Sequence, residues 1–282
     1  MSGSNGSITS FGFQNIETSK SDIVSHPQIY TNGSKRGVIH RHADGDTASE
    51  ITLLPSTQII MQKYPMVGSD QGIIGGAGVN YDKTWGNDTC LTNVNNCITY
   101  LQTTLGWAKS GKVFLTGYSM GGLEALVYAA HNNSKVAAIW VTNPALNLED
   151  MFTNDRGSVK AHIKQAYGLT TGQDPATQAD PTYSGTIQAN RDPYYMAGTG
   201  GNVSLFTSYP IIIWEGAQDN IVGSGSPVPD WIGTFASTVN AAGGNVTVVV
   251  DPSGGHFIPT TQTDLTNQGY VSKILDMFDA YN

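Results

Sequence analysis

The stretch KVFLTGYSMGGLEALVYAA, residues 112–130, is the strongest indication of the fold of this chain. Its apolar beginning, Val113–Thr116, predicts a buried strand, and its second half has the composition of a helix. Between the two lies the pattern G-x-S-x-G, filled by Gly117, Ser119 and Gly121. A strand, this pattern and a helix in succession predict a nucleophile elbow, a sharp turn that holds the serine hydroxyl above the sheet.

The residue types around this turn fit that prediction. Side chains at Gly117 and Gly121 would collide across so sharp a reversal, so glycine is needed on both sides of the serine. The helix that follows begins with backbone N–H groups that have no partner within the helix, at the positive end of its dipole. We therefore expect the N–H of Met120 to bind negative charge that develops on an oxygen atom. A turn that serves packing alone is the alternative.

Composition narrows the class of protein. The chain has 282 residues, a net charge of -8 and only 13% charged residues, which suits a globular protein of one domain spanning residues 1–282. The acidic balance argues against nucleic acid or an anionic membrane as the main partner. No apolar run has the length of a membrane span. The oligomeric state stays open.

The localisation also stays open. Residues 1–7, MSGSNGS, lack the basic start and the apolar stretch of a secretory signal. The chain therefore acts in the cytoplasm, leaves the cell by another route, for example as part of a virion, or has lost a leader.

Apolar strands alternate with helices along most of the chain, which predicts a mainly parallel sheet with helices on both faces. The predicted strands include one or two between Ile8 and Tyr30, and Gly37–His42, Met66–Val67, Ala137–Val141, Ile211–Trp214 and Val246–Val250. The other predicted helices are Thr47–Tyr64, interrupted by Pro55, then Asp88–Ala108, Trp231–Ala241 and Leu265–Tyr281.

Residues 143–209 break this alternation, because no strong strand is visible there. The segment holds helical pieces such as Val159–Tyr167 and an aromatic-rich stretch. We expect it to be a lid inserted over the carboxyl edge of the sheet. Tyr194, Tyr195 and Met196 are candidates for the lining of a pocket for an acyl chain, since such side chains offer large apolar contact areas. Packing of the lid onto the sheet is the alternative role.

A serine hydroxyl needs a base to take its proton, and the base needs a third group to orient it. Of the six histidines, only His256 lies in a small-residue loop, Gly254-Gly255-His256-Phe257, directly after a predicted strand. Such a loop lets the imidazole reach the elbow.

Asp219 is the candidate for the third group. It ends the sequence Trp214-Glu215-Gly216-Ala217-Gln218-Asp219, which follows a predicted strand and so lies at the carboxyl edge of the sheet. Asp251 and Asp230 are rivals, although one would close a turn and the other would cap a helix. The loop after the strand ending at Val141 offers Asn143 and no early carboxylate.

In the order Ser119, Asp219, His256, the chain resembles the α/β-hydrolase superfamily from about residue 35 onward. The segments GYSMGG (117–122), GAQD (216–219) and GHF (255–257) carry the resemblance. It implies a serine hydrolase with a mostly parallel central sheet. A carboxylic ester, small or polymeric, is the expected substrate. A peptidase or amidase of the same fold, or a binding protein that kept the fold, are the alternatives.

The same resemblance implies a second donor to the oxyanion. In the family the third strand commonly ends in His-Gly, and the next N–H completes the oxyanion hole. Here His42-Ala43-Asp44 stands at that place, with alanine instead of glycine, so Ala43 or Asp44 is the expected donor. The segment Gly86-Asn87-Asp88 is also similar to small hydrolases of actinobacteria and phage tails.

We expect neither a metal nor an organic cofactor. His40 and His42 lie two apart on one strand, but no set of carboxylates or further histidines gathers around them, which favours packing. The stretch Gly72–Gly78 lacks the Lys-Ser/Thr ending of a phosphate loop.

Cys90 and Cys97 would share one face of a regular helix, too far apart for a disulfide. Two buried thiols are therefore the favoured interpretation. A bond would need Cys90 to lie before the helix.

Overall fold

The computed structural model describes residues 11–14, 22–25, 33–68, 84–198, 200–222, 230–256 and 270–282. Within these ranges eight strands form one sheet in the order β1-β2-β4-β3-β5-β6-β7-β8. In chain order they are Phe11–Gln14 (β1), Asp22–Ser25 (β2), Arg36–Arg41 (β3), Met66–Gly68 (β4), Lys109–Tyr118 (β5), Val136–Thr142 (β6), Pro210–Gly216 (β7) and Asn245–Asp251 (β8). The strands from β4 across to β8 are parallel, whereas β1 and β2 are antiparallel additions at one edge.

The predicted mostly parallel sheet flanked by helices is confirmed. The central strands β6 and β7 are buried along their whole length. This is why they read as unbroken apolar runs in the sequence: helices cover both faces of a parallel sheet, so neither face of the strand meets water.

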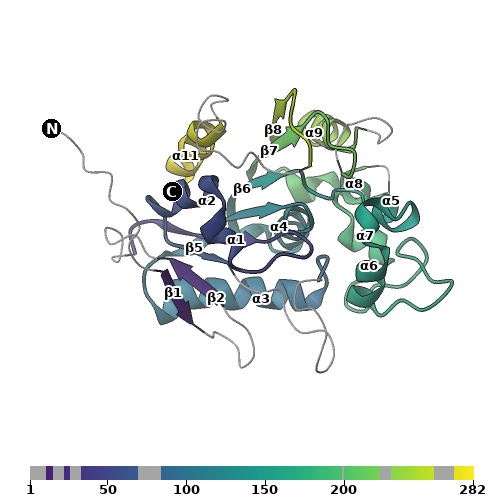
Figure 1. Ribbon diagram of the computed structural model, residues 1–282, viewed down its shortest axis with the longest axis horizontal. Coiled ribbons are helices and arrows are strands. Elements are labelled where there is room, and N and C mark those ends of the chain that lie inside the picture. Colours follow the sequence, from purple (N-terminus) through teal and green to yellow (C-terminus); the bar gives the residue numbers. More distant parts are fainter. Residues whose placement is uncertain are drawn as a thin grey trace.

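Helices cover the two faces of the sheet in separate groups (Figure 1). On one face α1 (Glu50–Leu53), α2 (Pro55–Met61) and α11 (Tyr270–Tyr281) enclose a core in which the rings of Phe114 and Phe278 stack with centroids 4.2 Å apart. On the other face lie α3 (Asp88–Thr99), α4 (Met120–His131) and α9 (Trp231–Ala241), which belong to the larger core. The sheet is thus the middle layer of three.

Two predicted helices are shorter or more divided than expected. The segment Thr47–Tyr64 forms α1 and α2, because proline at position 55 begins a second helix instead of continuing the first. The helix predicted to end at Ala108 gives way after Thr99 to a π-helical turn, Tyr100–Thr104. The stretch Gly72–Gly78 lies outside the described residues.

Residues 143–209 connect β6 to β7, and the described residues among them form no strand; one isolated bridge joins Ala179 to Thr186. The segment consists of short helices at one end of the sheet (Figure 1). They are α5 (Leu148–Thr153), Arg156–Ser158, α6 (Lys160–Tyr167), α7 (Ile187–Arg191), α8 (Pro193–Ala197) and Val203–Phe206. We call residues 143–209 the inserted segment.

Cys90 and Cys97 both lie within α3, both are buried, and no disulfide joins them. Among the helices that the structure describes, none combines the length and the hydrophobicity needed to cross a bilayer.

Candidate active site

The turn between β5 and α4 has the geometry of a nucleophile elbow. Ser119 sits at the turn with φ 52° and ψ -115°, a region that L-residues rarely adopt, and Met120 begins the helix. A Cβ atom at Gly117 would collide with the backbone of Gly121, and one at Gly121 would collide with the carbonyl of Arg41 at the end of β3. Backbone strain of this kind persists only where the surrounding structure holds it in place.

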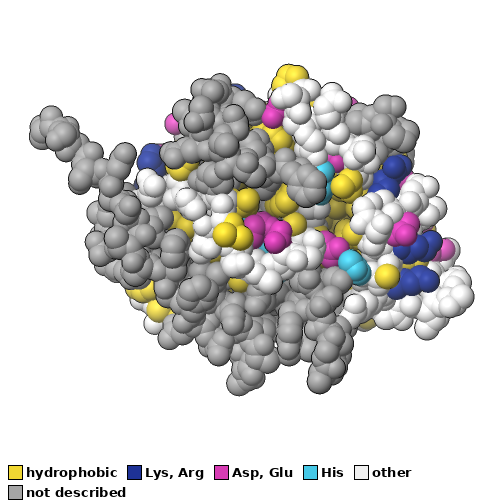
Figure 2. All heavy atoms as spheres, viewed as in Figure 1, with side chains coloured by type: hydrophobic (Ala, Val, Ile, Leu, Met, Phe, Trp, Pro, Cys, Tyr) yellow, Lys and Arg dark blue, Asp and Glu magenta, His cyan; other side chains and the backbone are white. Residues whose placement is uncertain are grey.

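The structure brings Ser119, His256 and Asp219 together from three different loops. The His256 Nε2 atom lies 3.1 Å from the Ser119 hydroxyl oxygen, and its Nδ1 atom lies 2.8 Å from Asp219 Oδ2. The imidazole therefore has hydrogen-bonding partners on both sides. Near the middle of one face of the molecule, acidic and histidine side chains gather with hydrophobic ones around them (Figure 2).

The Asp219 carboxylate is fully buried, and its hydrogen bonds fix its orientation. Its Oδ1 atom accepts from the N–H groups of Ile221 at 2.8 Å and Val222 at 3.1 Å, which leaves Oδ2 for the imidazole. These two backbone donors fix which carboxylate oxygen faces the ring. A buried anion held against one ring nitrogen also selects the tautomer in which that nitrogen carries the proton.

The two rival carboxylates make local contacts instead. Asp251 accepts hydrogen bonds from the N–H and the hydroxyl of Ser253, both at 3.0 Å, and so closes the turn after β8. Asp230 accepts from the N–H of Gly233 at 2.6 Å and caps α9. These are the structural roles, closing a turn and capping a helix, that the sequence suggests for Asp251 and Asp230.

The loop after β3 holds the two candidates for the second oxyanion donor, Ala43 and Asp44. The N–H of Ala43 donates to Glu50 Oε2 at 3.0 Å, and the other oxygen of that carboxylate lies 2.7 Å from His40 Nε2. Since the carboxylate already occupies this N–H, Ala43 does not offer a donor to a substrate in this structure. Asp44 is the remaining candidate of the two. At the elbow, Met120 is the first residue of α4, where an N–H has no acceptor within the helix.

The histidines of this region pack rather than gather as metal ligands. His40 bonds Glu50 and, through Nδ1, the hydroxyl of Thr116 at 2.9 Å. The His42 Nδ1 atom lies 2.8 Å from the carbonyl oxygen of Ala43, and burial lowers the pKa of His42 to about 4. In the described part of the chain no three His, Cys, Asp or Glu side chains are placed to hold a metal ion.

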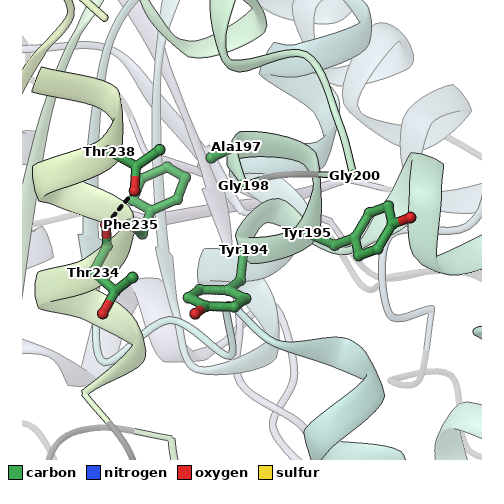
Figure 3. A pocket seen from close by; sticks show the side chains of 8 residues that line it. All are labelled: Tyr194, Tyr195, Ala197, Gly198, Gly200, Thr234, Phe235 and Thr238. Atoms are coloured by element: carbon green, nitrogen blue, oxygen red, sulfur yellow. Dashed lines mark hydrogen bonds between the residues drawn. The ribbon is translucent and has the colours of Figure 1, made fainter. Parts of the chain in front are cut away.

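The aromatic stretch of the inserted segment lines a cavity of about 110 Å³ between α8 and α9, together with Thr234, Phe235 and Thr238. Figure 3 shows the Tyr194 ring lying between the two helices, whereas the Tyr195 ring points away from α9. A Cβ atom at Gly200 would collide with the Tyr195 ring, so the two residues are closely packed. Met196 is buried in the core with 1% exposure and does not line this cavity.

Two residues beside the candidate site had no assigned role in the sequence. The Tyr118 hydroxyl donates to the carbonyl of His256 at 2.7 Å, and the Asn143 amide nitrogen donates to the same carbonyl at 2.8 Å. Tyr118 occupies a variable position of the G-x-S-x-G pattern. Asn143 follows β6, at a position where the sequence offers no carboxylate. Neither contact leaves a signal in the sequence beyond its position at the end of a strand.

Comparison with known proteins gives a match to one family model over part of the chain and a set of similar folds. A family model described as the alpha/beta hydrolase fold matches residues 76–161. No curated protein sequence matches the chain.

Solved structures resemble the chain over nearly its whole length, at low sequence identity. An acylaminoacyl peptidase from Pyrococcus horikoshii has a TM-score of 0.67 and 12% identity, covering 96% of this chain but only 42% of the peptidase. The Thermogutta terrifontis esterase Est2, bound to butyrate, has a TM-score of 0.62 and 14% identity, covering 95% of this chain and 93% of that one. Est1E from Butyrivibrio proteoclasticus, bound to ferulic acid, has a TM-score of 0.57 and 16% identity, covering 92% and 96%.

These neighbours share at most 16% of their residues with the chain, so the likeness establishes the fold alone. The family model matches part of the chain and these structures resemble nearly all of it, so the chain has the α/β-hydrolase fold.

Proposed function

We propose that this protein is a serine hydrolase that cleaves carboxylic esters through an acyl-enzyme on Ser119. The observation that carries the proposal is the hydrogen-bonded series Ser119, His256, Asp219, with 3.1 Å and 2.8 Å between the donor and acceptor atoms. The strained backbone of Ser119 supports it, because strain at a residue so placed is typical of a nucleophile elbow.

In the proposed reaction His256 Nε2 takes the proton of the Ser119 hydroxyl as its oxygen attacks the acyl carbon. Asp219 holds the ring and stabilises the positive charge that forms on it. The tetrahedral intermediate then collapses, the bond to the leaving alcohol breaks, and His256 returns the proton to that alcohol. A water molecule releases the acyl group from Ser119 by the same steps.

The oxyanion of the intermediate would be bound by the N–H of Met120 and by that of Asp44. Met120 is favoured by its position at the first turn of α4. Asp44 is favoured over Ala43 because Glu50 already accepts the Ala43 N–H. This chemistry requires no metal ion and no organic cofactor.

Amide cleavage is the nearest alternative, since the same three residues hydrolyse amides in other enzymes. The chain is similar to an acylaminoacyl peptidase, but it spans less than half of that protein, whereas it spans nearly all of the Thermogutta terrifontis esterase Est2. The full-length match favours ester substrates.

The proposal is tested with p-nitrophenyl esters of increasing acyl length and with the corresponding p-nitroanilides. We expect turnover of the esters, with much slower turnover of the anilides. Ser119→Ala should keep the fold and lose activity by about three orders of magnitude or more, because the members of such a triad act as a unit. Anilide turnover equal to or above that of the esters would favour the peptidase. A folded wild type that hydrolyses neither would indicate a binding protein.

A further inference from the structure

We infer that Asn143 is the positioning residue of this site: its amide side chain fixes the loop of His256 against the end of β7, which carries Asp219. The inference rests on the proposed function and adds to it the residue that aligns the base with the acid. Asn143 is the first residue after β6, fully buried, with a positive φ of 40°.

Each hydrogen-bonding group of the Asn143 side chain is used. The Nδ2 atom donates to the carbonyl of Gly255 at 3.0 Å and to that of His256 at 2.8 Å. The Oδ1 atom accepts from the N–H of Gly216 at 3.0 Å. One buried amide therefore bonds the backbone of the base and the backbone of the strand that leads to the acid.

The backbone on either side of Asn143 also contacts Ser119, the proposed nucleophile. The N–H of Ser119 donates to the carbonyl of Thr142 at 3.0 Å, and the carbonyl of Ser119 accepts from Ala145 at 3.1 Å. The N–H of Asn143 itself donates to the carbonyl of Trp214 in β7 at 2.9 Å. Residues 142–145 thus contact three parts of the site: the turn at Ser119, strand β7, which leads to Asp219, and the loop that carries His256.

Asparagine is the residue type that this position requires. A positive φ is tolerated by asparagine better than by most side chains, and a buried amide provides a donor and an acceptor together. An aspartate would place a carboxylate oxygen against two carbonyl oxygens. A position error of about 1 Å in the base is enough to reduce the rate by about 100-fold, so this anchoring affects catalysis directly.

The Tyr118 hydroxyl donates to the same His256 carbonyl, so the base loop is anchored from β5 as well as from β6. This second anchor gives an independent test. Removing one of the two donors should loosen the imidazole less than removing both.

The experiment compares Asn143→Asp, which keeps the size, with Asn143→Gly, which keeps the positive φ. Asn240→Asp is the matched control. The Asn240 amide also donates to a backbone carbonyl and accepts from a backbone N–H, both of Val246 at the start of β8, at the opposite end of that strand from the His256 loop. Reactive serines are counted with a fluorophosphonate, so that kcat is expressed per competent site, and all rates are measured well below each Tm.

We expect kcat per labelled serine to fall about tenfold or more in both Asn143 variants, with KM within about threefold of wild type. Tyr118→Phe should lower kcat by a smaller factor, and Asn240→Asp should leave it unchanged. Asn143 variants with a lower Tm and a wild-type kcat per labelled serine would show a purely structural role and overturn the inference. An unlabelled and inactive wild type would instead overturn the proposed function.

Discussion

His162 Nδ1 lies 2.6 Å from Asp44 Oδ2, so α6 of the inserted segment is paired with the loop after β3. Asp44 is the candidate for the second oxyanion donor. The contact therefore links the segment expected to act as a lid to the backbone that would bind the oxyanion. Both side chains are partly exposed, at 27% for His162 and 12% for Asp44.

This pair should couple the inserted segment to catalysis. A double-mutant cycle of His162→Ala and Asp44→Ala should give a coupling of about 1 kcal/mol in the free energy of unfolding. Each single variant should also lower kcat/KM severalfold, because the loop loses its anchor. The control is the pair Arg156 and Asp150, which lies wholly within the inserted segment. Breaking it should lower stability only. Unchanged kcat/KM in the His162 and Asp44 variants would show that the contact between the inserted segment and the loop after β3 does not affect catalysis.

The assignment of the acid predicts a difference between two conservative substitutions. Asp219→Asn should reduce kcat by about 10⁴-fold, because the amide no longer selects the imidazole tautomer that the base requires. Asp251→Asn should change kcat little, since Asp251 closes a turn with Ser253. If Asp251→Asn were the inactive variant and Asp219→Asn resembled wild type, the acid would have been assigned to the wrong residue.

Burial of His42 predicts how stability depends on pH. The folded chain holds the pKa of His42 at about 4, while an unfolded imidazole has a pKa of about 6.5. Below pH 6.5 the unfolded chain binds a proton that the folded chain does not. The free energy of unfolding should therefore fall as the pH decreases from 6.5 to 4, by at most about 1.4 kcal/mol per pH unit from this group.

His42→Gln should remove that contribution while leaving the carboxylates of the protein unchanged. Chemical denaturation of both proteins at several pH values measures it as the difference between two curves. Parallel curves between pH 4 and 6.5 would mean that the folded chain protonates His42 as readily as the unfolded one.

The two tyrosines of α8 should differ in their effect on substrate preference. Both tyrosines line the cavity, but the Tyr194 ring lies beside α9, whereas the Tyr195 ring points away from α9 and packs with Gly200 (Figure 3). If the cavity receives the acyl chain, Tyr194→Ala should lower kcat/KM for long acyl esters by about tenfold or more and leave the smallest ester within about twofold. Tyr195→Ala should lower the Tm and affect all esters equally. The same uniform loss in Tyr194→Ala would assign both rings to packing.

The sequence was sufficient to predict the sheet and the elbow, because both depend on local patterns. Continuous apolar runs predict the buried strands β6 and β7, and the glycines on either side of Ser119 predict the turn. Asp219 and His256 each follow a predicted strand, which is why the sequence predicts both at the carboxyl edge of the sheet. These are features that neighbouring residues determine.

The contacts that were missed join residues far apart in the chain. The carboxylate of Glu50 occupies the N–H of Ala43, and nothing near Ala43 in the sequence indicates it. The amide of Asn143 reaches a carbonyl 113 residues away. Such hydrogen bonds depend on how separate strands align, and a pattern of apolar residues predicts the strands without predicting these partners.

The central claim is that Ser119 is an activated nucleophile, and covalent labelling tests it most directly. The wild-type protein is treated with a fluorophosphonate and digested, and the modified residue is located by mass spectrometry. We expect one adduct, on the peptide that contains Ser119, with no adduct in Ser119→Ala and much slower labelling in a His256→Ala variant. A folded wild type that stays unlabelled, or an adduct that persists in Ser119→Ala, would contradict the claim.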